Sequence, residues 1–228
     1  MTIAQASLMS LVAEAREPNM EIPIVIVNYY SAVFLRHCLE AVAAQSFLPS
    51  HILIVNNGDT EGALDFVAEL YPNCRVIEQQ NIGFAAGNNL ALSLLTDCDW
   101  VALLNPDAYP EPDWLENLVS CLKQNPDIDV VSCQMLQVRD PEVLDGCGDC
   151  YHVSGLAWRD RHGERVAIAQ EYTEVFSACC AAALFRRSAL LAVGGFDESF
   201  FCYFEDVDLG FRLRLQGFSC IHTTKAIV

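Results

Sequence analysis

Two acidic residues, Glu205 and Asp206, stand side by side at the predicted start of a helix. They follow a paired-glycine turn and an aromatic-rich stretch in the sequence GGFDESFFCYFEDVDLGFRLRLQGF, residues 194–218. A helical wheel places one apolar stripe toward the core and Asp206 roughly away from it. The stripe consists of Phe204, Val207, Phe211 and Leu215.

Asp206 has the setting of a general base, because the small Gly210 one turn later is expected to leave open space beside the carboxylate. A carboxylate that rigid packing holds beside such a space can remove a proton from a hydroxyl group. Helix electrostatics offer a second explanation. Acidic residues in the first turn stabilise a helix by roughly 0.3 to 1 kcal/mol without taking part in chemistry.

A second candidate group is Asn105-Pro106-Asp107, which directly follows an apolar run. A carboxylate at the end of a strand can bind a divalent metal through oxygen and share it with a diphosphate. The same composition is common in ordinary turns, so the tripeptide alone leaves both explanations open.

A third candidate is the sequence NIGFAAGNN at residues 81–89, which includes Asn81, Gly83, Gly87 and Asn88. Its glycines allow the backbone to approach a ligand or to bend tightly, and its amides can donate hydrogen bonds to a diphosphate or a sugar. The segment is not G-x-G-x-x-G and follows the third predicted strand. These two features disfavour a dinucleotide-dependent dehydrogenase.

Alternating strands and helices must position these groups. Apolar, β-branched runs typical of buried strands alternate with segments typical of helices, the first of which we expect Ser31 to cap. This alternation predicts an α/β fold with a central, mostly parallel sheet. The predicted strands are residues 22–27, 51–55, 74–78, 100–104, 130–138 and 220–228, and the clearest helices are residues 62–70, 82–95 and 114–123.

Polar residues follow three of the predicted strands. In parallel α/β sheets, ligands bind outside the carboxyl ends of the strands, so these side chains are expected to converge on one edge. They are Asn28 and Tyr29 after the first strand, Asn56, Asn57 and Asp59 after the second, and Asn105 and Asp107 after the fourth.

Composition limits the class of protein. A chain of 228 residues with 53% hydrophobic content predicts one domain, residues 21–228, after a short helical extension at residues 1–20. A net charge of -17 with scattered Lys and Arg argues against a nucleic-acid partner. The N-terminus lacks a basic region ahead of an apolar block, which argues against a secretory signal, and there is no apolar run of about 18 residues. Eleven cysteines, an odd number, indicate reduced thiols in the cytoplasm.

The sequence does not decide the interpretation of two regions. Residues 139–172 lose periodicity, and we interpret them as loops and short antiparallel strands over the site, where an acceptor could be recognised, or as a solvated excursion. The pair Cys147 and Cys150 has C-x2-C spacing, but no second pair completes a zinc site. The strand-like end at residues 220–228 raises the expectation that the chain is the front part of a longer protein.

In this order, the motifs resemble the inverting family 2 glycosyltransferases with a GT-A fold, and especially the rhamnosyltransferase-like branch that builds bacterial surface polysaccharide. The resemblance covers residues 22–222. It rests on IVIVNYYS, LIVNNGDTEG, NIGFAAGNN, LLNPDA and the long, specific block ALFRRSALLAVGGFDESFFCYFEDVDLGFRLRLQGF.

The resemblance implies transfer of a sugar, with inversion, from a nucleoside-diphosphate donor to a saccharide or lipid-linked acceptor. It implies a divalent cation, Mg²⁺ or Mn²⁺, and a location in the cytoplasm, with peripheral association at the inner face of the membrane through the acceptor. The residues that it assigns fall into five groups. Asn28, Tyr29, Asn57 and Asp59 hold the nucleotide, Asn81, Gly83, Gly87, Asn88 and Asn105 complete the donor site, Asp107 binds the metal, Asp206 is the general base, and Asp197, Glu198 and Glu205 lie on the acceptor side.

Three departures from the family pattern weaken parts of this assignment. Asn56 stands where many members have an Asp, and Asn105 replaces the first Asp of the metal-binding D-x-D, as is usual in the rhamnosyltransferase-like branch. The chain ends before the His that joins the metal site in most members, and His222 comes too early to match it. A non-catalytic or truncated sugar-nucleotide-binding domain therefore remains an alternative.

A nucleotidyltransferase is disfavoured, because Asn28-Tyr29-Tyr30-Ser31 lacks the glycines and basic residues that such an enzyme needs after its first strand.

Overall fold

The computed structural model describes residues 20–167 and 170–228. The predicted helical extension at residues 1–20 lies outside the described residues except for Met20.

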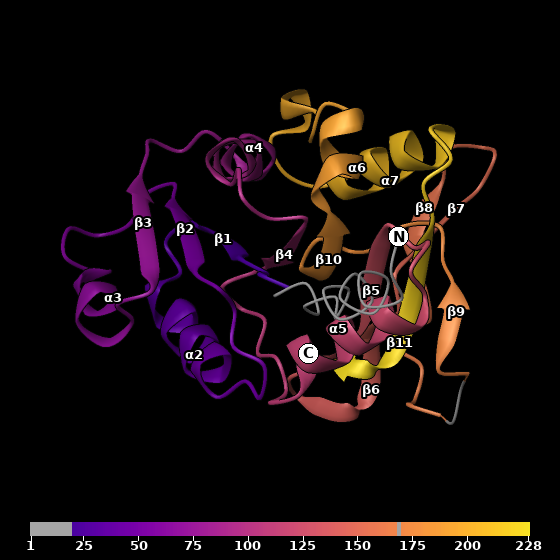
Figure 1. Ribbon diagram of the computed structural model, residues 1–228, viewed down its shortest axis with the longest axis horizontal. Coiled ribbons are helices and arrows are strands. Elements are labelled where there is room, and N and C mark those ends of the chain that lie inside the picture. Colours follow the sequence, from indigo (N-terminus) through magenta and orange to yellow (C-terminus); the bar gives the residue numbers. More distant parts are fainter. Residues whose placement is uncertain (1–19, 168–169) are drawn as a thin grey trace, which may run out of the picture.

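A nine-stranded sheet forms the centre of the molecule, in the order β3-β2-β1-β4-β10-β5-β11-β9, with β6 paired to β5 (Figure 1). The first four strands are parallel to one another, and β10 runs antiparallel between β4 and β5. The predicted α/β fold with a central, mostly parallel sheet is confirmed. The strands are β1 (Ile24–Asn28), β2 (Ile52–Asn56), β3 (Cys74–Glu78), β4 (Trp100–Leu104), β5 (Val130–Gln137), β6 (Asp140–Gly146), β9 (Tyr172–Glu174), β10 (Ala182–Arg186) and β11 (Cys220–Ile227).

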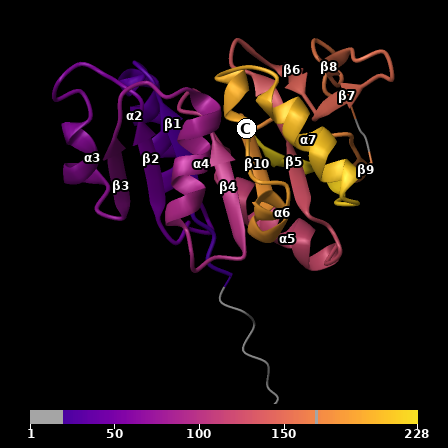
Figure 2. The ribbon, with the colours of Figure 1, turned by 90° about the horizontal axis from the view of Figure 1, so that it is seen from above.

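Helices cover both faces of the sheet (Figures 1 and 2). One face carries α2 (Ala32–Ala43), α3 (Asp65–Leu70) and α5 (Trp114–Gln124), and the other carries α4 (Phe84–Leu94), α6 (Arg187–Ala192) and α7 (Glu205–Leu215). Every residue of β1, β2 and β4 is buried, as their apolar runs require when both faces are covered. No helix in the described part of the chain is long and apolar enough to cross a membrane.

A two-stranded sheet, β7 (Asp149–Tyr151) and β8 (Ala157–Arg159), lies beside α7 (Figure 1). The ring of Tyr151 stacks on Phe176 with centroids 5.0 Å apart and packs against Phe211 of α7 at 5.2 Å. The short antiparallel strands predicted within residues 139–172 are therefore present, and aromatic contacts dock them on the last helix.

The predicted buried stripe of α7 is wrong. Its interior face is formed by Leu209 and Leu213 together with Glu205 and Gly210, whereas Phe204 and Leu215 are exposed. The wheel favoured the stripe with the larger side chains, but the side with Gly210 can approach the rest of the protein more closely.

Candidate active site

Polar side chains at the ends of β1 and β2 form a buried network. Asn28 donates from Nδ2 to Asn56 Oδ1 at 2.9 Å and to Asp59 Oδ2 at 3.2 Å. Asn56 in turn donates to Glu78 Oε2 at 2.8 Å. Ser31 does not cap α2 as expected, because its hydroxyl donates to Asn28 Oδ1 instead. The network fixes the loops where the two strands end.

Exposed aromatic rings surround this edge of the sheet. Tyr29 and Tyr30 are both exposed and meet edge to face with ring centroids 4.9 Å apart. Asn57 is buried behind them and donates to Gly83 O, but its Oδ1 has no hydrogen-bond partner among the described residues. Of the predicted nucleotide-binding residues, Tyr29 is thus exposed, Asp59 is half-buried, and Asn28 and Asn57 are buried.

The glycine-containing segment before α4 is occupied mainly by contacts within the protein. The backbone N–H groups of Phe84 and Ala85 donate to the carbonyl of Phe201. Contrary to the expectation, these two groups are therefore not free to bind a diphosphate. Asn81 accepts from Gly83 N, and Asn88 is buried and donates to Phe84 O. Gly87 packs against Val27 and Asn57. These contacts give Gly83, Gly87 and Asn88 a packing role.

Asn105 and Asp107 line a cavity of about 530 Å³. Asn105 directly follows β4, and its N–H donates to Ala181 O at 2.8 Å. Asp107 is exposed two residues later. The tripeptide therefore forms a turn that also presents its carboxylate to a cavity, and metal binding by Asp107 stays a prediction.

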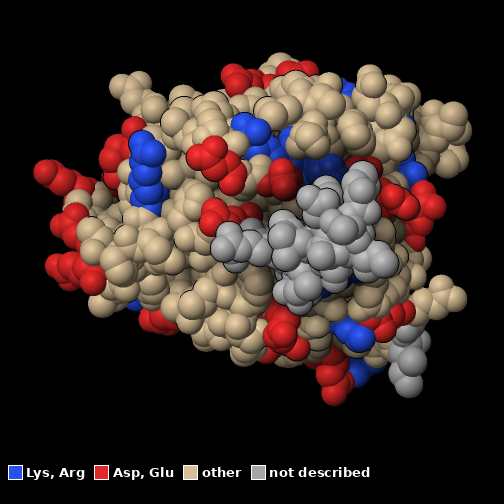
Figure 3. All heavy atoms as spheres, viewed as in Figure 1, with Lys and Arg blue, Asp and Glu red and all other residues tan. Residues whose placement is uncertain are grey.

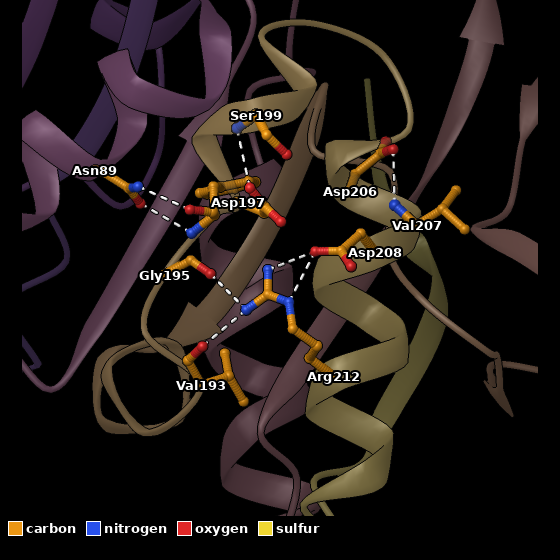
Figure 4. Close-up of polar contacts among 10 residues, drawn as sticks. Asn89, Val193, Gly195, Asp197, Ser199, Asp206, Val207, Asp208 and Arg212 are labelled. Carbon is orange, nitrogen blue, oxygen red and sulfur yellow. Dashed lines mark hydrogen bonds and ion pairs between the residues drawn. The ribbon is translucent and has the colours of Figure 1, made fainter.

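Asp206 lines a second cavity, of about 230 Å³, together with the buried carboxyl groups of Asp149 and Glu205. The predicted open space beside Gly210 is wrong, because Ser177 fills it. Room for a substrate lies instead on the side of Asp206 that faces β7 and β8. The Asp206 carboxylate accepts from Val207 N at 2.9 Å and points away from the ion pair of Asp208 and Arg212 (Figure 4).

Two of these carboxyl groups hold their protons unusually tightly. Burial, reinforced by the charge of Asp206, raises the pKa of Asp149 to about 7. Burial likewise raises the pKa of Glu205 to about 7, again with a contribution from Asp206. Because Asp149 and Glu205 resist ionisation, Asp206 is the member of this group that is suited to carry a negative charge.

Hydrogen bonds from Arg212 hold α7 to the segment before it (Figure 4). The guanidinium donates to Asp208 on its own helix and to the carbonyls of Val193 and Gly195. Asp197 then accepts from Ser199 N and caps the short 3-10 helix η1 (Glu198–Phe200). The predicted acceptor-side residue Glu198 accepts from Asn89 Nδ2.

The cavities of Asp107 and Asp206 meet at Arg159, which lines both. The segment from Ser177 to Ala181 contacts a lining residue of each cavity, since Ser177 donates to Asp149 and Ala181 accepts from Asn105. Asp107 and Asp206, which are far apart in the sequence, thus line two cavities that have Arg159 in common. Acidic side chains also spread over the face seen in Figure 3.

The oxygen ligands around Asp107 fit a cation that is shared with a substrate. The described residues contain no group of three or more His, Cys, Asp or Glu side chains that could hold a metal ion. Cys147 and Cys150 are therefore not part of such a group. Mg²⁺ needs only one or two protein carboxylates when substrate phosphates and water complete its shell. Asp107 with the amide oxygen of Asn105 can supply such a partial set.

Sequence reasoning missed Asp149 and Arg159 as site residues. Both lie in residues 139–172, where no periodicity assigns a side chain to a face. Their pairing across β7 and β8 places them at the cavities, and the only signal was the expectation that this region covers the site.

Comparison with known proteins identifies the family. The model of glycosyl transferase family 2 matches residues 24–194. The chain belongs to this family. A curated N-acetylglucosaminyl-diphospho-decaprenol L-rhamnosyltransferase of Mycobacterium tuberculosis is 29% identical, over 91% of this chain and 75% of that protein. The galactofuranosyltransferase GlfT1 of the same organism is 27% identical, over 85% of this chain and 64% of its own length.

Solved structures show that this family 2 chain has a GT-A fold. A mannosyltransferase of Pyrobaculum calidifontis, in complex with GDP-Man and Mn²⁺, superimposes with a TM-score of 0.66 and 20% identity over 91% of this chain. GalNAc-T7 with UDP, GalNAc and Mn²⁺ superimposes with a TM-score of 0.70 and 12% identity. The chain spans 55% and 43% of those two structures.

Proposed function

We propose that this family 2 glycosyltransferase moves a sugar, a rhamnose-like deoxyhexose or another hexose, from a nucleoside-diphosphate donor to a saccharide or lipid-linked acceptor. Inversion at the anomeric carbon and a role in surface polysaccharide synthesis are part of the proposal. One observation carries it, namely that the cavities of Asp107 and Asp206 share Arg159 in their linings. The rhamnosyltransferase relative supports the substrate class.

Asp206 acts as the general base in this proposal. Its carboxylate takes the proton of an acceptor hydroxyl, and the oxygen attacks the donor sugar on the face opposite the leaving group. Asp149 and Glu205, whose raised pKa values keep them largely protonated below about pH 7, leave the proton-accepting role to Asp206. A single displacement of this kind inverts the anomeric carbon and needs no second carboxylate as nucleophile.

Donor binding is assigned to the other cavity and to the ends of β1 and β2. Asp107 and Asn105 would hold a divalent cation, Mg²⁺ or Mn²⁺, which when bound neutralises charge on the departing nucleoside diphosphate. The two structures with Mn²⁺ support this choice of cofactor. The exposed Tyr29 and the half-buried Asp59 are the groups suited to contact the nucleotide.

The proposal is tested by screening TDP-, UDP- and GDP-sugars with the purified protein, with and without Mn²⁺. A donor that binds the folded state raises the melting temperature by mass action, and we expect one nucleotide class to do so only with metal. Mass spectrometry with an acceptor that is linked to a lipid through a diphosphate then detects transfer. NMR of the product determines its anomeric configuration.

The same screen separates the alternatives. Binding without transfer or donor hydrolysis would indicate a non-catalytic sugar-nucleotide-binding domain, and a product that retains configuration would refute inversion. The absence of any donor-dependent shift would contradict the proposed function itself.

A further inference from the structure

Arg159 occupies the junction of the two cavities. It is the last residue of β8, and its side chain is about one third exposed, at 34%. One cavity that it lines contains Asn105 and Asp107, and the other contains Asp206. A group bound by Arg159 would therefore lie between the predicted metal ligand and the predicted base.

The side chain of Arg159 is held in place before any ligand arrives. Its Nη1 donates to Asp145 Oδ2 at 2.5 Å, and its Nη2 contacts Cys179 Sγ at 2.9 Å. Its aliphatic stem lies against Gly146, where a Cβ would overlap Arg159 Cγ and Cδ. Only part of the guanidinium's donor capacity is engaged by these contacts, so a preorganised fork remains available to a ligand.

The charges around Arg159 make it the natural contact for a phosphate. The cavity of Asp206 is lined by Asp149, Glu205 and Asp206, and Arg159 is the one basic residue in its lining. A diphosphate that approaches the Asp206 carboxylate needs a positive charge beside it, and Arg159 can supply that charge. A guanidinium matches phosphate geometry with two parallel hydrogen bonds, which an ammonium cannot form.

We propose that Arg159 binds the diphosphate group of a substrate. The inference rests on the proposed function and extends it, since it assigns a phosphate contact to β8. Two substrates could supply the group, the nucleoside-diphosphate donor or an acceptor linked to a lipid through a diphosphate. A purely structural role, the ion pair with Asp145, is the alternative that an experiment must separate.

The test compares wild type with Arg159→Gln and Arg159→Lys by calorimetric titration in the presence of Mg²⁺. TDP, UDP and GDP probe the donor's diphosphate, and farnesyl diphosphate probes a lipid diphosphate. Arg165→Gln is the matched control, because Arg165 belongs to the same region, pairs with Glu142 and is 72% exposed outside both cavities.

We expect Arg159→Gln to weaken binding of one probe class by about 10- to 100-fold, the range for a lost hydrogen bond to a charged group. Loss confined to the nucleotides assigns Arg159 to the donor, and loss confined to farnesyl diphosphate assigns it to the acceptor. Arg159→Lys keeps a charge and is expected to fold, but to bind more weakly than wild type. Arg165→Gln should bind like wild type.

Equal affinities of wild type and both Arg159 variants for every probe would overturn the inference. If wild type and Arg159→Gln also transfer sugar equally well, the proposed function stands and only the role of Arg159 falls. If wild type binds none of the probes and none of the nucleotide sugars, both the proposed function and the role of Arg159 are contradicted.

Discussion

Gly210 of α7 lies directly against Ser177, so closely that a Cβ at Gly210 would overlap Ser177 Cβ. Ser177 also donates from Oγ to Asp149 Oδ2 at 3.4 Å. The same residue therefore holds the last helix on one side and the carboxyl group of Asp149 on the other. Close packing at this glycine brings Asp206 of α7 within electrostatic reach of Asp149 in β7.

Replacement of Gly210 by Ala should destabilise the fold. The added methyl group collides with Ser177, and overpacking of this kind costs about 1–3 kcal/mol of unfolding free energy. Urea unfolding of Gly210→Ala measures the loss. In a Ser177→Gly background the collision partner is removed, so the same substitution should cost less. Equal losses in both backgrounds would contradict the proposed contact.

Asp206→Asn should nearly abolish transfer while donor affinity is retained. General-base assistance is typically worth 10² to 10⁴ in rate, and an amide cannot accept the proton. Single-turnover rates and donor titrations measure the two effects separately. Asp208→Asn serves as a control two positions away, where loss of the Arg212 ion pair should lower the melting temperature and leave the transfer rate nearly unchanged. A fast Asp206→Asn variant would exclude this residue as the base.

Asp107→Ala should weaken donor binding that depends on metal. If this carboxylate holds the cation, its removal should cost about 10- to 100-fold in affinity for the donor in Mn²⁺, with little change in buffer containing a chelator. Asp113→Ala is a matched control, because Asp113 is exposed six positions later and does not line the cavity. Donor titrations in Mn²⁺ that are identical for Asp107→Ala and wild type would refute the assignment.

The sheet was predictable because its strands are continuous apolar runs that need cover on both faces. Residues 100–104 are an instance, since the predicted strand and β4 (Trp100–Leu104) coincide and every residue of β4 is buried. The position of the polar residues at the ends of β1, β2 and β4 was predictable for a different reason, because parallel strands place their carboxyl ends on one edge of the sheet.

The surroundings of Asp206 could not be read from periodicity. Arg159 and Asp149 reach it through a two-stranded sheet whose docking depends on ring contacts between Tyr151 and Phe211, which are distant in the sequence. The orientation of α7 was mispredicted because size favoured its aromatic side, whereas Gly210 selected the side that packs.

Stability should fall as the pH rises from about 4 to about 7 through the contributions of Asp149 and Glu205. Their pKa values in the folded protein are about 7, against ordinary values of 3.8 and 4.5. The folded state keeps both protons where the unfolded chain has lost them. The stabilisation is therefore complete below about pH 4 and lost by about pH 7.

Buried His222 acts in the opposite direction, because burial lowers its pKa to about 4 and stability from it is lost as the pH falls below 6.5. The informative quantity is thus the difference between wild type and Asp149→Asn, which imitates the protonated carboxyl group beside Asp206, Arg159 and Ser177. In urea unfolding from pH 4 to 8, the free energy of unfolding of Asp149→Asn should increase relative to that of wild type as the pH rises. A constant difference would mean that Asp149 ionises normally.

Asn56→Asp, which introduces the residue that the family resemblance leads us to expect at this position, should destabilise this protein. Asn56 Nδ2 donates to Glu78 Oε2 at 2.8 Å, and an Asp would set two carboxylates face to face while it loses that donor. A lost hydrogen bond to a charged group costs about 1.5–3 kcal/mol. Glu78→Gln should restore most of the loss, because its amide can donate to the new carboxylate, whereas Glu78→Gln alone should change little. Chemical unfolding of the four proteins measures this coupling, and a stable Asn56→Asp single variant would show that Glu78 does not account for the departure at position 56.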